Sequence, residues 1–490
     1  MKIVDHTGGM LAASWEVIAE RLVNLTSPEE FSQQLEVLYK EKGIGADASR
    51  RGVVLVARDT RPHSEALMRL ACRGVELAGG AAHDIGIATT PQLHYAVERF
   101  NRGAPADVIA INELLSDYYT TLCGGFEELI ATADAGATAV RQQVTVDCAN
   151  GVGSISLREF VPRLQCVDID PRNEAYSGPV NDNCGAEHCQ KLQIPPATMT
   201  RVHAEATATA TVIDGHPLKC SLDGDADRIV FHVLAEGKGE PLWTLFDGDK
   251  IACLVALFVS RELTAAGLIA EGKDEFKFGV VQTAYANGAS TAYLRAQRIP
   301  VLFAKTGVKY CHKVAHEAFD CGVYFEANGH GTVLFSEELS ARINAPRAVG
   351  EGGERQELAF KRLRAALRVI NQVTGDAISD MLLCLAVLQV YSMSSAEWCA
   401  LYQDLPSRQV KCKVSDKSLI RCSNDEMEVV EPRALQERLF ASMSAVQQGR
   451  CFIRPSGTED VVRIYAEAAC ADGIAILVAD ASRAIEDLIK

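Results

Sequence analysis

Short apolar runs alternate along this chain with longer stretches in which apolar residues recur at helical spacing. Residues 52–57, 144–147 and 278–283 are strand-like runs, and the first two end directly in polar or glycine-containing turns. Residues 65–78 follow the first run with the pattern of an amphipathic helix. The repetition of strand, turn and helix predicts an α/β protein whose ligands bind at the carboxyl ends of the strands.

The last part of the chain shows a different order of elements. Residues 355–373 form a long helical pattern, and from about residue 380 a helix is followed by strands and a loop at Arg454. A strand over 461–466 and a helix over 472–489 close the chain. This order predicts a smaller α+β domain at the C-terminus. Because the chain has 490 residues, three or four domains are expected rather than one core.

The charge and hydropathy of the chain exclude several classes of partner. The net charge is −15, which gives no support to binding of nucleic acid or of an anionic membrane. The longest apolar run, residues 251–259, is too short to span a bilayer and predicts a buried helix. We therefore expect a small-molecule partner, attracted by a local basic cluster if it is anionic. The sequence does not indicate an oligomeric state.

The cysteines predict a reducing compartment. The chain has 16 of them, without a C-x-x-C pattern. Cys184, His188 and Cys189 would suit zinc only with a further ligand pair, and none is near in the sequence, so inert thiols are expected. Residues 1–5 lack the apolar segment of a secretory signal. Together these observations predict a cytoplasmic protein.

Three aspartates at alternate positions form the first candidate site. Asp223, Asp225 and Asp227 follow a strand-like segment, residues 219–222, and precede Arg228. Three carboxylates at one point repel each other unless a cation neutralises them, and oxygen ligands suit Mg²⁺. An EF-hand loop is excluded because Arg228 and Leu234 stand where glycine and glutamate are needed. An aspartyl nucleophile and a solvated acidic turn remain as alternatives.

A second candidate site is the loop that begins at Arg454. Ser456, Gly457 and Thr458 offer hydroxyl groups and consecutive backbone N–H groups, the chemistry of an anion-binding nest. Arg454 and Arg463 can add charge-assisted hydrogen bonds to a phosphate. The same residues also suit a plain turn.

Two further loops follow strand-like runs. Glu326 and Asn328, with Ala327 between them, suit recognition of sugar hydroxyls, and His330 is a candidate for proton transfer. A capped turn would use the same residues. Lys309, in the segment 305–309, is a second proton-transfer candidate. The cationic segments 305–309 and 58–61 are expected either to contact the substrate or to be solvated loops.

These motifs, in this order, resemble the α-D-phosphohexomutase superfamily, and most closely its phosphoacetylglucosamine mutase family. The likeness is carried by D-G-D-A-D-R, T-G-V-K, E-A-N-G-H-G and R-P-S-G-T-E-D-V-V-R, and by the longer stretches 280–290, 323–332 and 452–467. Residues 58–62, 89–95 and 147–153 extend it over nearly the whole chain.

The resemblance implies a fold of three successive α/β domains with mixed sheets, the first of them truncated, and a smaller α+β domain. The expected limits are 1–137, 138–243, 244–380 and 381–490. It implies an isomerase that transfers a phosphoryl group through a phosphoserine. The reaction interconverts N-acetylglucosamine 6-phosphate and N-acetylglucosamine 1-phosphate during UDP-N-acetylglucosamine biosynthesis.

The resemblance also implies roles for the candidate residues. Asp223, Asp225 and Asp227 would hold Mg²⁺ beside the phosphoserine. Glu326 and Asn328 would bind the sugar, with Ala327 between them in the same loop. The phosphate that is not reacting would be bound by the loop residues and a following arginine: Arg454, Pro455, Ser456, Gly457, Thr458 and Arg463. Arg228, His330 and Lys309 are the candidates for a direct part in the chemistry.

The family's serine lies in a loop of the type T-A-S-H-N-P, and this hexapeptide does not occur in the sequence. We expect the serine to precede residue 1 in a longer reading frame of an active mutase. The alternatives are a catalytically inactive sugar-phosphate-binding homologue and a Mg²⁺-dependent sugar phosphatase with Asp223 as its nucleophile. The phosphatase hypothesis leaves the loops at 326–331 and 454–458 unexplained.

Overall fold

The computed structural model describes residues 52–102, 108–133, 141–200, 218–235, 242–269, 275–347, 353–456 and 461–489, with a few isolated positions between 30 and 40. The chain divides into two compact units. One comprises Met1–Val54 and Arg73–Ala82, and the other comprises Leu55–Cys72 and His83–Lys490. The candidate site lies entirely in the second unit.

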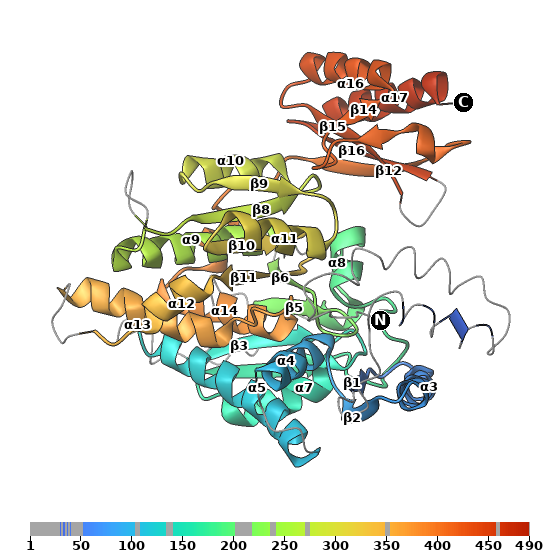
Figure 1. The fold of residues 1–490 in the computed structure, drawn as a ribbon. Helices are drawn as coiled ribbons and strands as arrows, with labels where there is room; N and C mark the ends of the chain where they lie inside the picture. Colours follow the sequence, from blue (N-terminus) through green and yellow to red (C-terminus); the bar gives the residue numbers. More distant parts are fainter. Residues whose placement is uncertain are drawn as a thin grey trace. The chain divides into compact units, whose positions relative to one another are not determined.

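The first elements alternate strand and helix, as predicted (Figure 1). They are β1 (Val53–Arg58), α3 (Ser64–Leu77), β2 (Ala81–Ile87), α4 (Thr90–Asn101) and α5 (Val108–Ile130). The strand expected over 52–57 and the helix expected over 65–78 are confirmed as β1 and α3. Helix α4 begins at a capping box in which Thr89 and Gln92 bond each other's backbone, so the start of this helix is fixed by its own sequence.

A five-stranded mixed sheet comes next, in the order β4-β3-β5-β6-β7. Its strands are β3 (Gln142–Asp147), β4 (Val167–Arg172), β5 (Lys219–Leu222), β6 (Ile229–Ala235) and β7 (Leu242–Phe246), with helices α7 (Gly153–Phe160) and α8 (Ala186–Leu192). Strands β3, β4 and β5 are parallel, and Asp147 pairs with Ser221 at their carboxyl ends. The turns after β3 and β5 therefore lie next to each other.

A four-stranded sheet follows, in the order β11-β10-β8-β9. It contains β8 (Phe278–Thr283), β9 (Val301–Ala304), β10 (Cys321–Phe325) and β11 (Gly331–Phe335). Because β8, β9 and β10 are parallel, the loops that follow them, residues 284–287, 305–307 and 326–330, emerge at one edge of the sheet. The helices of this region are α9 (Gly248–Ala266), α10 (Gly288–Ala296), α11 (Val308–Ala318), α12 (Glu337–Asn344), α13 (Gly353–Val369), α14 (Ala377–Val390) and α15 (Ser395–Cys399).

The main hydrophobic core surrounds two helices. All residues of α14 are buried, and α9 is buried along most of its length, which confirms the buried helix predicted around 251–259. No helix among the described residues is long and apolar enough to cross a membrane. The helical pattern predicted over 355–373 is wrong at its end, since α13 stops at Val369. The Ser379 hydroxyl donates to the Val369 carbonyl (2.7 Å) and accepts from the Asn371 N–H (3.0 Å), so a side chain from α14 ends the helix.

The C-terminal region is a smaller α+β layer pair. Its antiparallel sheet has the order β12-β16-β15, with β12 (Ser407–Lys413), β15 (Arg450–Pro455) and β16 (Val461–Glu467). A second pair is β13 (Arg421–Cys422) with β14 (Val429–Glu431), and α16 (Arg433–Ala445) and α17 (Ala471–Leu488) cover one face of the three-stranded sheet (Figure 1). The predicted strand over 461–466 and the closing helix are confirmed. The domain limits stay predictions, although position 380 lies inside α14.

Candidate functional site

The three aspartates occupy a tight turn between β5 and β6. Asp223 is buried, and its Oδ1 accepts hydrogen bonds from the N–H groups of Asp227 (3.0 Å) and Arg228 (3.2 Å). Ala226 has a positive φ of 57°, which reverses the chain between the second and third aspartates. One carboxylate oxygen of Asp223, Asp225 and Asp227 each lies within 4.8 Å of the other two. The turn therefore gathers the carboxylates that alternate along the sequence.

The charges in this turn favour a cation. Burial, and next the neighbouring charges of Asp227 and Asp225, hold the pKa of the Asp223 carboxyl well above its usual range. The Arg228 Nε lies 3.5 Å from a carboxylate oxygen of Asp223 and 3.5 Å from one of Asp227, so one guanidinium faces two of the three carboxylates. Within the described part of the chain, the buried Asp227 Oδ1 has no hydrogen-bond partner. These residues fit a hard divalent cation such as Mg²⁺.

Neighbouring segments hold the aspartate turn in place. The Thr90 hydroxyl donates to Asp225 Oδ2 (2.7 Å), and the Thr90 N–H donates to the Asp225 carbonyl (3.2 Å). Gly151, in the turn after β3, approaches so closely that a Cβ atom on it would lie 2.4 Å from the Gly224 carbonyl oxygen. Thr90 was not among the predicted site residues, because a single threonine in the first turn of a helix carries no signal of a contact 135 residues away.

The loop after β10 lies beside the aspartate turn. Ile229, at the start of β6, donates its N–H to the Gly329 carbonyl (3.2 Å), and the His330 Nδ1 lies 3.7 Å from Asp227 Oδ2. Gly329 has a φ of 84°, and a Cβ atom on it would lie 1.8 Å from the Ile229 carbonyl oxygen. Only glycine permits this approach. The structure thus brings His330 and Arg228 to the predicted metal ligands.

The predicted sugar-binding residues share this loop. Asn328 Oδ1 accepts the N–H of His330 (3.0 Å), so its amide NH₂ is the group that remains for a ligand. Glu326 Oε1 accepts the N–H of Gly307 (2.8 Å), which joins the loop after β10 to the loop after β9. The Ala327 carbonyl accepts the N–H of Gly248 (3.3 Å) and anchors the loop at the start of α9.

The predicted phosphate-binding arginines lie on one face of the C-terminal sheet. In the β15–β16 register, Arg454 is directly opposite Arg463, Phe452 opposite Tyr465 and Arg450 opposite Glu467. The alternate residues, such as Ile453 and Ile464, belong to the hydrophobic core that includes residues of α16 and α17. Like charges directly opposite each other destabilise a strand pair, and a bound anion would relieve this repulsion.

The loop between these strands is described only at its base. Pro455 is the last residue of β15 and pairs with Val462, and the buried Ser456 donates its N–H to the Val461 carbonyl (2.9 Å). Gly457 and Thr458 lie outside the described residues. The described bonds place Ser456 at the end of the sheet that carries Arg454.

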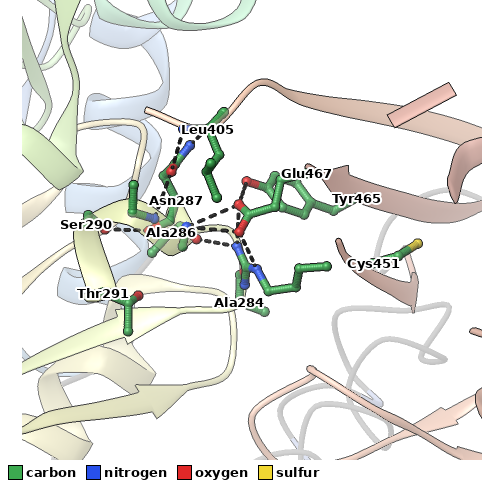
Figure 2. A network of polar contacts seen from close by, with 12 residues as sticks. Ala284, Ala286, Asn287, Ser290, Thr291, Leu405, Cys451, Tyr465 and Glu467 are labelled. Carbon is green, nitrogen blue, oxygen red and sulfur yellow. Dashed lines mark hydrogen bonds and ion pairs between the residues drawn. The ribbon is translucent and has the colours of Figure 1, made fainter. Parts of the chain in front are cut away.

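A buried ion pair fixes the other end of this sheet face (Figure 2). Arg450 and Glu467 form two hydrogen bonds of 2.9 Å, and the Glu467 carboxylate also accepts the N–H of Gly288 at the start of α10. The Arg450 guanidinium donates in addition to the carbonyls of Ala284 (2.8 Å) and Ala286 (2.5 Å). The β15–β16 pair is therefore tied to the loop after β8. This ion pair was not predicted from the sequence, because Arg450 and Glu467 become neighbours only through the register of β15 and β16.

Lys309, the segment 58–61 and the cysteines were also considered in the sequence, and no described contact joins the first two to the aspartates. Lys309 is exposed at the start of α11, with its ammonium 4.9 Å from the Tyr310 ring, and no described contact joins it to the aspartates. In the segment 58–61, Arg61 pairs with Asp59 and Arg58 with Glu65. All sixteen cysteines are free thiols, Cys184 and Cys189 among them.

Known proteins share these features over nearly the whole chain. Residues 247–393 match domain III of phosphoacetylglucosamine mutase AMG1. Residues 34–111 and 410–483 match the α/β/α domain I and the C-terminal domain of phosphoglucomutase/phosphomannomutase. The chain is 39% identical to the phosphoacetylglucosamine mutase of Oryza sativa, covering 100% of this chain and 85% of the relative. It is 40% identical to that of Homo sapiens, covering 96% and 81%.

Solved structures agree with the sequence relatives. Aspergillus fumigatus N-acetylphosphoglucosamine mutase, in complex with GlcNAc-6P and magnesium, superposes with a TM-score of 0.81 at 35% identity, covering 96% of this chain and 88% of that one. The product complex of an N-acetylglucosamine-phosphate mutase of the α-D-phosphohexomutase superfamily gives a TM-score of 0.84 at 34% identity, covering 100% and 86%. This chain belongs to the phosphoacetylglucosamine mutase family.

Proposed function

We propose that this protein is a phosphosugar mutase that interconverts N-acetylglucosamine 6-phosphate and N-acetylglucosamine 1-phosphate. One observation carries the proposal: described contacts connect the aspartate turn to the phosphate-binding strands. Asp227 lies beside His330, whose loop is joined through Glu326 to Gly307. Thr306 is in turn joined through Glu426 to Arg454. A metal site, a sugar loop and a phosphate site in one chain of contacts are what a phosphosugar mutase needs.

The aspartate turn is proposed to hold Mg²⁺ through Asp223, Asp225 and Asp227. Asp227 Oδ1, which has no hydrogen-bond partner among the described residues, and the raised pKa of Asp223, caused first by burial, support this assignment. When bound, the cation supplies positive charge that stabilises a phosphoryl group in transfer. Arg228 adds a guanidinium at the same point. Burial acts to lower its pKa, but the surrounding carboxylates, Asp223 and Asp227 first, together raise the pKa above its usual value.

The substrate is proposed to be a sugar phosphate bound at two places. Glu326 and Asn328 hydrogen-bond the sugar, while Ala327 and Pro455 shape the two loops. Arg454, Ser456 and Arg463, with Gly457 and Thr458, bind the phosphate that is not reacting. Because each phosphate must in turn reach the metal, a fixed second phosphate site anchors both orientations of the sugar.

Proton transfer to and from the sugar hydroxyl is assigned to His330, which lies 3.7 Å from Asp227. Lys309 is a weaker candidate because its ammonium lies over Tyr310. The phosphoryl donor that the resemblance implies is a phosphoserine, and the proposal assigns no residue of this sequence to that role. The sixteen free thiols support a reducing, cytoplasmic location, and the acidic net charge supports a small-molecule partner rather than nucleic acid or a membrane surface.

The test uses protein purified from its native source, incubated with Mg²⁺ and N-acetylglucosamine 6-phosphate and followed by ³¹P NMR. We expect a 1-phosphate signal to grow until the two isomers reach equilibrium, without free phosphate. Release of inorganic phosphate would show a sugar phosphatase instead. If the substrate binds but neither a 1-phosphate signal nor free phosphate appears, the protein is a non-catalytic sugar-phosphate binder.

A further inference from the structure

Glu426 lies at the tip of the turn between β13 and β14, outside every predicted motif. Its φ is 60°, a left-handed conformation that glutamate rarely adopts. The turn is closed by hydrogen bonds from the Glu426 N–H to the Ser423 carbonyl (3.0 Å) and from the Ser423 N–H to the Glu428 carbonyl (2.8 Å). The turn therefore holds Glu426 in an unfavourable backbone conformation, and its side chain projects from the tip of the turn.

A single carboxylate oxygen of Glu426, Oε2, accepts two hydrogen bonds and forms one ion pair. The donors are the Thr306 N–H (2.9 Å) and the Thr306 hydroxyl (2.6 Å), and the Arg454 Nε lies 3.0 Å from the same oxygen. The Glu426 and Arg454 side chains are 15% and 18% exposed, so the ion pair is largely shielded from water. Charge-assisted bonds with little solvent access hold both partners in one geometry.

The three-residue link Thr306–Glu426–Arg454 joins two parts of the proposed substrate site. The next amide along the chain, Gly307 N–H, donates to Glu326, a proposed sugar ligand. Consecutive amides of the loop after β9 thus bond one carboxylate on the sugar side and one on the phosphate side. A displacement of Glu426 would move Arg454 relative to Glu326.

The edge of the arginine that Glu426 uses is important for phosphate binding. A guanidinium offers one edge formed by Nε and a terminal nitrogen, and another formed by its two terminal nitrogens. Glu426 occupies Nε, so a phosphate must be met by the terminal nitrogens. A carboxylate that fixes the rotation of an arginine in this way reduces the entropy lost when the anion binds.

We propose that Glu426 is a positioning residue for the substrate, one that orients Arg454 toward the non-reacting phosphate and ties it to the sugar loop. The proposal rests on the proposed function and adds to it a residue that does not itself touch the substrate. The opposite role, a carboxylate that competes with the phosphate for Arg454, predicts the opposite change in affinity.

The test measures the dissociation constant of N-acetylglucosamine 6-phosphate by calorimetry for the full chain in Mg²⁺. We expect Glu426→Gln to raise this constant about tenfold, the loss of one charge-assisted contact. Thr306→Val, which removes one donor without changing charge, should raise it about threefold. The matched control is Glu428→Gln, an exposed glutamate of the same turn, which should leave the constant unchanged.

The Arg454→Ala background shows whether Glu426 acts through the arginine. There, Glu426→Gln should change the dissociation constant less than twofold, because the group that it positions is gone. A full tenfold effect in that background would overturn the proposal. So would tighter binding by Glu426→Gln, which indicates competition, or unchanged binding in both Glu426→Gln and Thr306→Val. If the wild-type chain does not bind the sugar phosphate, the proposed function fails rather than this role of Glu426.

Discussion

The ion pair between Arg450 and Glu467 allows a quantitative test of how strands β15 and β16, which carry the proposed phosphate-binding arginines, are held. The Glu467 side chain is 2% exposed and accepts bonds from Arg450, Gly288 and the Tyr465 hydroxyl (2.8 Å). In Glu467→Ala the Arg450 guanidinium, 21% exposed, loses its carboxylate partner and keeps the carbonyls of Ala284 and Ala286 and its place over the Tyr465 ring. Removing one partner of a buried ion pair costs about 3–5 kcal/mol.

Hydrogen exchange measured by mass spectrometry gives the local cost. A loss of about 3 kcal/mol corresponds to an increase of roughly a hundredfold or more in the exchange rate of amides protected by local opening. We expect this increase in peptides covering β15, β16 and the start of α10. Glu437→Ala is the control, because Glu437 forms an exposed pair with Arg433 that is worth about 0–1 kcal/mol.

A double substitution separates the ion pair from general damage to the sheet. Arg450→Met combined with Glu467→Leu replaces the pair with apolar groups and leaves no buried charge, so it should cost less than Glu467→Ala alone. If Glu467→Ala exchanges no faster than Glu437→Ala, or if the double variant is as unstable as the sum of its single changes, the anchoring role is wrong.

Three further predictions concern the metal, the phosphate and pH. Asp225→Asn should weaken Mg²⁺ binding measured by calorimetry at least tenfold. The Mg²⁺ affinity of the wild-type protein should decrease as the pH is lowered, because the raised pKa of Asp223, caused first by burial, lets a proton compete with the cation. Arg454→Ala should raise the KM for the sugar phosphate about tenfold with Mg²⁺ affinity unchanged, and a lower metal affinity would contradict the two-site division. Burial, and next the charge of Lys219, lowers the pKa of His232 to about 3.

The direction in which His232 makes the free energy of unfolding depend on pH is set by comparison with the unfolded chain, in which histidine titrates near pH 6.5. Between about pH 6.5 and 3 the unfolded state binds a proton that the folded state does not. The contribution of neutral His232 to the free energy of unfolding is therefore complete above pH 6.5 and is lost progressively as the pH is lowered. His232→Gln should flatten the fall of the urea midpoint between pH 7 and 4. An equally steep fall in the variant would show that other groups cause the acid sensitivity.

The part of the fold that follows local rules could be predicted from the sequence. Strand β8 is fully buried and reads as an apolar run, and the alternation of strand and helix correctly placed the loops after β9 and β10 at strand carboxyl ends. The aspartate turn was predicted because its three carboxylates are close in the chain. The same reasoning failed at the end of α13, since the hydroxyl that ends this helix comes from α14.

The contacts that connect the site could not be predicted, because they join residues far apart. Thr90 bonds Asp225 over 135 positions, and Thr306 bonds Glu426 over 120. The acidic segment around Glu426 looks like any solvated turn until its partner loop is in place. Strand register could not be predicted either. Arg454 lies opposite Arg463 only because of the way in which the residues of β15 and β16 pair.

The arrangement of charge explains why the substrate site needs residues such as Glu426. The chain carries a net charge of −15, and three carboxylates gather at one end of the proposed site while two arginines face each other at the other. A sugar phosphate that binds in two orientations must find the distance between these groups unchanged each time. A cation held by the aspartates would fix one end, but the arginines lie on a separate sheet. The Glu426 link and the Arg450–Glu467 pair both tie that sheet to loops of the four-stranded β11-β10-β8-β9 sheet. Loss of either should therefore weaken binding of the phosphate before it alters binding of the metal.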